Sequence, residues 1–203
     1  MKHLKWLIQC LTIAIGYCIN AFIVIWVGEN KVLDSISLFC LLFIFFHNIA
    51  RRPLFILKDV FALYKELQFI SILESVVTVL LSYFFVLKSG IRGVMFASVL
   101  AIILTNFFYL PFAIYKRIFN CFPWRDLAKY LFSFGITTIV LMLSIKFLPE
   151  ISCSGIFIWF IQSCLYSIVV LLGLSVIYFV FLKSFRMLFK RGITFAKNIL
   201  IKE

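Results

Sequence analysis

Apolar runs, each about as long as a bilayer is thick, follow one another along the whole chain and are separated by short polar segments. An α-helix rises about 1.5 Å per residue, so roughly 20 residues cross the ~30 Å hydrocarbon core of a membrane. The predicted fold class is therefore all-α, a polytopic membrane helical bundle of about six transmembrane helices. The spans are expected at about Leu4–Val27, Val32–Ala50, Gln68–Leu87, Ile91–Tyr115, Asp126–Phe147 and Ile156–Leu182.

The segments between the spans carry turn and interface signals. Turns are predicted at Gly28–Lys31 and Lys88–Gly93, and a loop at Leu148–Gly155. Pro53 ends the second span, because proline cannot continue a helix. The segment Leu54–Gln68 mixes apolar and charged residues, which predicts a short helix at the membrane interface.

The last 21 residues form a segment of their own in the prediction, and their composition differs from that of the spans. Lys and Arg are interspersed there with Phe, Leu and Ile, a pattern typical of an amphipathic segment that lies on a membrane surface. The chain is thus divided into a six-helix bundle at residues 1–182 and a basic amphipathic tail at residues 183–203.

Composition supports a membrane protein and argues against a nucleic-acid partner. The chain is 65% hydrophobic and only 14% charged, whereas soluble domains have about 25% charged residues. Its formal net charge of +12 comes from short clusters between apolar runs, and no basic face on a polar fold is predicted. Membrane lipid, and not nucleic acid, is the expected partner of this surface.

The distribution of basic residues predicts which ends of the spans face the cytoplasm. Sixteen of the 20 Lys and Arg residues lie in the N-terminal segment, in the segments 51–66 and 116–129, and in the tail. The segments on the opposite side hold only Lys31, Lys88, Arg92 and Lys146. Since cytoplasmic segments collect Lys and Arg, both termini are expected in the cytoplasm.

No catalytic or metal-binding set is predicted. The six cysteines form no C-x-x-C pair, and most lie in apolar runs, where cysteine behaves as a small hydrophobic residue. His3 and His47 lack the neighbours that a metal or nucleophilic site would need. We therefore expect no cofactor and no enzymatic activity.

One polar stripe inside a predicted span stands out. Five residues of the third span share one helical face through spacings of three and four, namely Ser71, Glu74, Ser75, Thr78 and Ser82. Glu74 lies roughly 9 Å from the cytoplasmic end of that span. In the functional interpretation, Glu74 with Ser71 and Thr78 binds a coupling ion or acts as a gate. In the structural interpretation, Glu74 makes a hydrogen bond between helices or lies near the water boundary.

Weaker stripes lie in three other spans. They comprise Gln9, Thr12, Gly16 and Asn20 in the first, Ser98, Ala101, Thr105 and Tyr109 in the fourth, and Gln162, Tyr166 and Gly173 in the sixth. Small and polar residues allow membrane helices to pack closely, so helix packing is favoured over ligand contact for each stripe. Together the stripes predict a bundle with a somewhat polar interior.

The order and spacing of several short motifs resemble the bacterial polysaccharide flippases, the O-antigen (Wzx-type) exporters of the multidrug/oligosaccharidyl-lipid/polysaccharide superfamily. The motifs are Phe22-Ile-Val-Ile-Trp-Val-Gly28, Ala62-Leu-Tyr-Lys65, Ile72-Leu-Glu-Ser-Val76, Gly90-Ile-Arg-Gly-Val94 and Pro111-Phe-Ala-Ile-Tyr-Lys-Arg-Ile-Phe119. The resemblance covers roughly residues 10–150 and only the second of the two bundles of such transporters. Ala62 stands where the family often has glycine.

The resemblance implies a membrane transporter fragment that moves an undecaprenyl-diphosphate-linked oligosaccharide across the bacterial inner membrane, with an N-terminal half-bundle or a second copy as its partner. It implies that basic residues contact the diphosphate at the two mouths of the pathway: Arg51, Arg52, Lys116 and Arg117 on the cytoplasmic side, and Arg92 on the outer side. The alternative role of these five residues is to anchor the topology. The alternative function is a non-transporting membrane scaffold of the polysaccharide assembly machinery.

Overall fold

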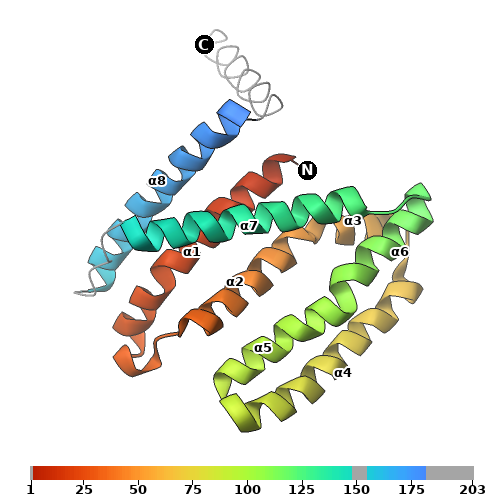
Figure 1. Cartoon of the computed structure of the whole chain (residues 1–203), viewed down its shortest axis with the longest axis horizontal. Coiled ribbons are helices and arrows are strands. Elements are labelled where there is room, and N and C mark those ends of the chain that lie inside the picture. Colours follow the sequence, from red (N-terminus) through yellow and green to blue (C-terminus); the bar gives the residue numbers. More distant parts are fainter. Residues whose placement is uncertain (1, 148–154, 182–203) are drawn as a thin grey trace, which may run out of the picture.

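The computed structural model describes residues 2–147 and 155–181, and every long element in these ranges is a helix (Figure 1). The helices are α1 (Lys2–Trp26), α2 (Ser35–Ala50), α3 (Arg52–Val60), α4 (Tyr64–Ser89), α5 (Ile91–Ile102), α6 (Phe108–Phe119), α7 (Trp124–Phe147) and α8 (Ile156–Phe181). A short 3-10 turn, Glu29–Lys31, follows α1, and a π-helical turn, η2 (Ile103–Phe107), joins α5 to α6. The all-α prediction is confirmed. The predicted tail and most of the loop before α8 lie outside the described residues.

Six helical stretches within the described residues are long and apolar enough to cross a membrane. They are Trp6–Trp26, Ser35–Val60, Gln68–Ser89, Ile91–Phe119, Trp124–Lys146 and Ile156–Val176. Each corresponds to one of the six spans that the sequence predicts, and the chain is accordingly a membrane protein.

The helices form an extended array, with α1 and α2 in its middle. Helix α1 contacts α2, α7 and α8, whereas α2 contacts α5, and α5 pairs with α4. Figure 1 shows the α4–α5 hairpin on the side of the molecule away from α8. One side of the hairpin therefore forms an edge of the array.

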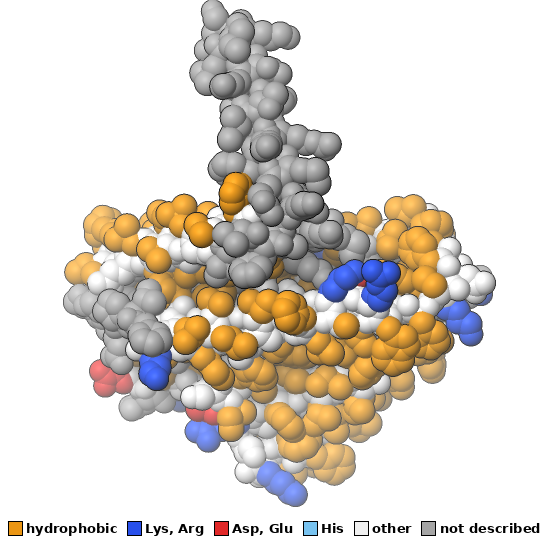
Figure 2. Space-filling model, turned by 45° about the horizontal axis from the view of Figure 1, so that its top comes forward, with side chains coloured by type: hydrophobic (Ala, Val, Ile, Leu, Met, Phe, Trp, Pro, Cys, Tyr) orange, Lys and Arg blue, Asp and Glu red, His pale blue; other side chains and the backbone are white. Residues whose placement is uncertain are grey.

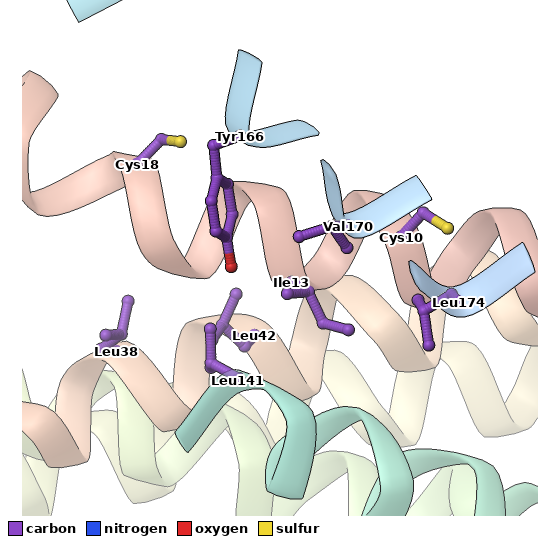
Figure 3. Close-up of a cluster of buried hydrophobic side chains, with 9 residues drawn as sticks. All are labelled: Cys10, Ile13, Cys18, Leu38, Leu42, Leu141, Tyr166, Val170 and Leu174. Carbon is purple, nitrogen blue, oxygen red and sulfur yellow. The ribbon is translucent and has the colours of Figure 1, made fainter. Parts of the chain in front are cut away.

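A core of small and medium side chains holds α1, α2, α7 and α8 together (Figure 3). It consists of Cys10, Ile13, Cys18, Leu38, Leu42, Leu141, Tyr166, Val170 and Leu174, all at most 9% exposed. Outside this core, large apolar side chains are exposed, and Figure 2 shows them covering most of one face, with Lys and Arg mostly near its margins. Such a surface suits lipid, which is as apolar as the side chains that face it.

The predicted interfacial helix at Leu54–Gln68 is wrong in its extent. Helix α3 ends at Val60, and α4 begins at Tyr64, well before the predicted start of the third span. Ala62, between the two helices, has a φ of 51°. This left-handed conformation ends many helices. The Leu63 N–H donates to the Lys58 carbonyl at 3.0 Å, which satisfies one carbonyl of the last turn of α3.

The fourth span is not a regular helix, and this changes which residues it buries. Ala97, Ala101 and Thr105 are buried at a spacing of four, and in α6 a spacing of four resumes with the buried Leu110 and Ile114. A π turn adds one residue, so the buried face moves on by one position after η2. The expectation that Tyr109 shares the face of Thr105 is therefore wrong, and Tyr109 is 50% exposed.

Candidate functional site

A break in the backbone hydrogen bonding of the fourth span creates the most unusual polar site in the described residues. Pro111 lies inside α6 and has no N–H, so the carbonyl of Phe107, four residues earlier, loses its usual helical donor. The Arg51 guanidinium fills this place and donates from Nη2 to the Phe107 carbonyl at 2.6 Å. Residues 56 positions apart are thereby joined where α2 ends.

Arg51 is buried among aromatic side chains. It is 3% exposed, and its guanidinium carbon lies 5.2 Å from the ring centroid of Phe107 and 5.3 Å from that of Tyr130. A carbonyl and two aromatic faces thus stabilise the positive charge. Within the described residues, Arg51 Nη1 is buried without a hydrogen-bond partner.

His47 lies one turn before Arg51 on the same face of α2. Its Nδ1 is 3.2 Å from the Tyr130 hydroxyl, and its ring stacks near Phe43 and Phe107. Its Nε2 is buried, and no partner for it is found in the described part of the chain. His47, Arg51 and Tyr130 therefore form a buried polar cluster between α2 and α7, next to η2.

A hollow of about 50 Å³ adjoins this cluster where the ends of α2 and α6 meet the start of α7. Arg51, Tyr130, Tyr115 and Asp126 contribute its polar lining. The Tyr115 hydroxyl donates to the Asp126 carboxylate, and Lys129 Nζ lies 3.4 Å from Asp126 Oδ1. A space of this size and polarity suits ordered water and is too small for a sugar.

Glu74, the predicted coupling or gating residue, contacts the same irregular turn from α4. Its carboxylate lies beside the side chain of Asn106 in η2. The Thr78 hydroxyl, in contrast, donates to the Glu74 carbonyl of its own helix at 2.7 Å. Ser71 is exposed, and its carbonyl accepts the Ser75 hydroxyl at 3.0 Å. Glu74 and Asn106 thus face each other between α4 and η2, and both the inter-helix hydrogen bond and ion coupling stay predictions.

The five basic residues predicted to contact substrate have different surroundings. Arg52, Lys116 and Arg117 are exposed at the end of the bundle where Arg51 is buried. Arg92 lies at the opposite end, and its Nε is 3.1 Å from Asp34 Oδ1, just before α2. The structure therefore does not bring all five residues together.

Asp34 joins the start of α2 to the start of α5. The sequence places it inside the second predicted span, whereas the structure places it just before α2. The Ser37 hydroxyl donates to Asp34 Oδ1 at 2.6 Å. This hydrogen bond, together with the charge of Arg92, lowers the pKa of Asp34.

The polar stripe of α1 serves helix packing, as the sequence favours. Gln9 is fully buried and donates from Nε2 to the Ser133 carbonyl at 2.8 Å, and its Oε1 accepts the Tyr178 hydroxyl. The Asn20 side chain donates to the Leu33 carbonyl at 3.2 Å. These bonds join α1 to α7, to α8 and to the segment before α2.

The larger hollow lies on the surface between α1 and α8 and has a volume of about 340 Å³. Its lining includes Leu11, Ile15, Phe22 and Trp159, and the few hydroxyls come from Ser163 and Ser167. The sequence gives no sign of it, because it depends on how two helices far apart in the chain meet. Its apolar lining suits a hydrocarbon chain better than a sugar.

Sequence reasoning missed Asn106, Tyr130, Tyr115 and Asp126 as parts of polar sites. One signal was present, because Pro111 inside an apolar span implies that the carbonyl of Phe107 needs another donor. The spacing of four between His47 and Arg51 also places both side chains on one face. No group of residues able to hold a metal ion occurs in the described ranges.

Comparisons with protein-family models, with curated proteins and with solved structures find no match to this chain. The resemblance to polysaccharide flippases therefore rests on the sequence motifs, and the function that follows from it is a proposal.

Proposed function

We propose that the chain is one half-bundle of a transporter that moves a lipid-linked oligosaccharide across the bacterial inner membrane, with both termini in the cytoplasm. The carrying observation is the position of Glu74. It is half-buried inside a membrane span, with the exposed Ser71 and Ser75 beside it on α4, at the edge of the array. Ionisable residues inside membranes face a protein interior or a water-filled cavity, so a second bundle over this edge would give Glu74 a suitable environment.

In the proposed mechanism, two such bundles enclose a polar pathway and rock between inward-open and outward-open states. The exposed Arg52, Lys116 and Arg117 attract the diphosphate at the cytoplasmic end. The lipid tail stays in the bilayer while the sugars cross. Glu74 binds the proton or sodium ion that drives the cycle.

The first test is complementation of a bacterial strain that lacks its polysaccharide flippase. Residues 1–203 are expressed alone and together with a first-half bundle, and surface polysaccharide is measured. Restoration by the fragment alone indicates a self-assembling half-transporter, whereas restoration only with the other half indicates a split transporter. Failure of both arms, with the protein present in the membrane, contradicts the proposal.

The second test separates the role of Glu74 from folding. Glu74→Gln keeps the size and polarity of the side chain but removes the titratable group. We expect loss of export at an unchanged membrane level of the protein, while Ser98→Ala, whose hydroxyl donates to the Val94 carbonyl of its own helix, retains export. Full export by Glu74→Gln would show that Glu74 does not couple ions.

A second candidate function, the non-transporting scaffold, is favoured by one observation. The 340 Å³ hollow is mainly apolar and the polar hollow measures only about 50 Å³, so neither admits an oligosaccharide. A scaffold would be recognised by loss of polysaccharide assembly on deletion of the chain, with no accumulation of lipid-linked oligosaccharide on the cytoplasmic face. Accumulation there would exclude the scaffold.

A further inference from the structure

We propose that the fourth span bends at η2 and that this hinge moves the tip of the α4–α5 hairpin relative to the α1–α8 part of the bundle. The inference goes beyond the proposed function, because it requires no substrate and no partner. It is carried by three features that meet at one level of the span: the π turn Ile103–Phe107, the proline at 111, and two side chains from other helices that fasten the turn.

The backbone is weakest at this point. The π turn replaces the regular i to i+4 pattern of bonds, and the missing N–H of Pro111 removes the next bond along the helix. The Thr105 hydroxyl donates to the Ala101 carbonyl at 2.7 Å, an arrangement that often bends helices. Sharp kinks in helices occur at such sites.

Two side chains hold the turn from opposite sides. Arg51 at the end of α2 donates to the Phe107 carbonyl, and Glu74 on α4 lies beside the side chain of Asn106. Helix α4 passes the hinge without a break, so a change in the kink also bends α4 next to η2. On one side of the hinge its Ile70 packs with Leu110 and Ile114, and on the other its Phe85 packs against Phe96.

The hairpin beyond the hinge moves as one piece in this proposal. At its turn, a Cβ on Gly93 would lie 2.2 Å from the Phe85 carbonyl oxygen, so the two backbones are in direct contact. From Phe107 to Ile91 the chain spans roughly 24 Å, and a change of about 20° in the kink moves the tip by about 8 Å. At the tip, the Arg92–Asp34 ion pair adds only a weak tether, because Arg92 is largely exposed, so the packing of α5 against α2 is the contact that the movement must shift.

The test measures the distance between Ser89 at the hairpin tip and Phe157 on α8 by pulsed electron paramagnetic resonance. The full chain is reconstituted in lipid nanodiscs, and the labels are introduced through non-canonical amino acids, so the six native cysteines remain. Both positions are exposed. In the wild type we expect a distance distribution whose width is comparable to the 8 Å displacement.

Pro111→Ala returns the missing N–H and should narrow the distribution at least twofold. Glu74→Ala removes the polar side chain through which α4 contacts η2, and it should broaden the distance distribution. Thr78→Ala, one turn away on α4, should leave the distribution unchanged. A wild-type distribution as narrow as that of Pro111→Ala overturns the hinge. If Pro111→Ala does not fold, equal widths for Glu74→Ala and Thr78→Ala overturn it.

Discussion

At the scale of single residues, Arg51 and Arg52 show how one missing backbone hydrogen bond gives two adjacent arginines different environments. Arg52 is exposed, whereas Arg51 is 3% exposed and donates to the Phe107 carbonyl. The sequence predicts the same role for both, because the charge pattern does not distinguish them. Their environments differ because Pro111 leaves the Phe107 carbonyl without a helical donor, and of the two arginines Arg51 is the one that donates to it.

We expect Arg51→Met to lower the free energy of unfolding by about 1–3 kcal/mol, because the Phe107 carbonyl is then buried without a donor. Arg52→Met should change it by less than about 0.5 kcal/mol. In a Pro111→Ala background the helix supplies the donor, so the loss caused by Arg51→Met should shrink. Denaturant titration of the four variants in detergent measures this cycle, and an undiminished loss would show that Arg51 acts independently of the proline.

Ala62 is a second residue whose backbone decides its environment. Its φ of 51° is unfavourable for any side chain with a Cβ. Ala62→Gly should therefore raise the free energy of unfolding by about 1 kcal/mol. Ala128→Gly, at an exposed position inside α7, should lower it by a similar amount. The thermal unfolding midpoints of both variants test this prediction, and a loss of stability in both would contradict a left-handed conformation of Ala62.

At the scale of elements, close backbone contact distinguishes the α4–α5 hairpin from the other helix pairs. Gly93→Ala should lower the free energy of unfolding by at least about 1–3 kcal/mol, because its Cβ would lie 2.2 Å from the Phe85 carbonyl oxygen, which cannot rotate away. Gly135→Ala in α7 meets nothing within 4 Å and should be neutral or stabilising. A comparison of their unfolding midpoints checks the contact, and equal midpoints would contradict it.

The elements also show how far the sequence predicts this structure. The six spans follow from the length of the apolar runs, since a helix satisfies the backbone hydrogen bonds of such a run within the run itself. The π turn does not follow from the apolar pattern, because the side chains that contact it, Arg51 and Glu74, come from other helices. The buried face of the fourth span after Thr105 was therefore predicted one residue too early, at Tyr109 and not at Leu110.

Of the candidate site, Glu74 was singled out from its polar stripe. Its neighbour Asn106 was not, because an isolated amide in an apolar run has no spacing that relates it to other polar residues.

At the scale of the whole molecule, the distribution of charge predicts the orientation in the membrane. We expect a green fluorescent protein fused after residue 203 to fluoresce in the cytoplasm, and alkaline phosphatase fused after Lys31 to be active outside it. Both follow from the predominance of Lys and Arg in the segments predicted to be cytoplasmic. The reverse pattern of the two reporters would invert the topology and with it the assignment of the two mouths.

The one additional residue of the π turn has a consequence for which changes in length the chain can accept. Deletion of Leu104, which is 65% exposed, would leave a regular helix in which Ala97 and Ala101 stay in line with Leu110 and Ile114, while Thr105 moves off that line by one position. Deletion of the equally exposed Ile139 would instead rotate half of α7 by about 100° and separate its buried positions. Membrane levels of the two deletion variants should therefore differ, which makes the fourth span a place where the chain can lose a residue and keep its core.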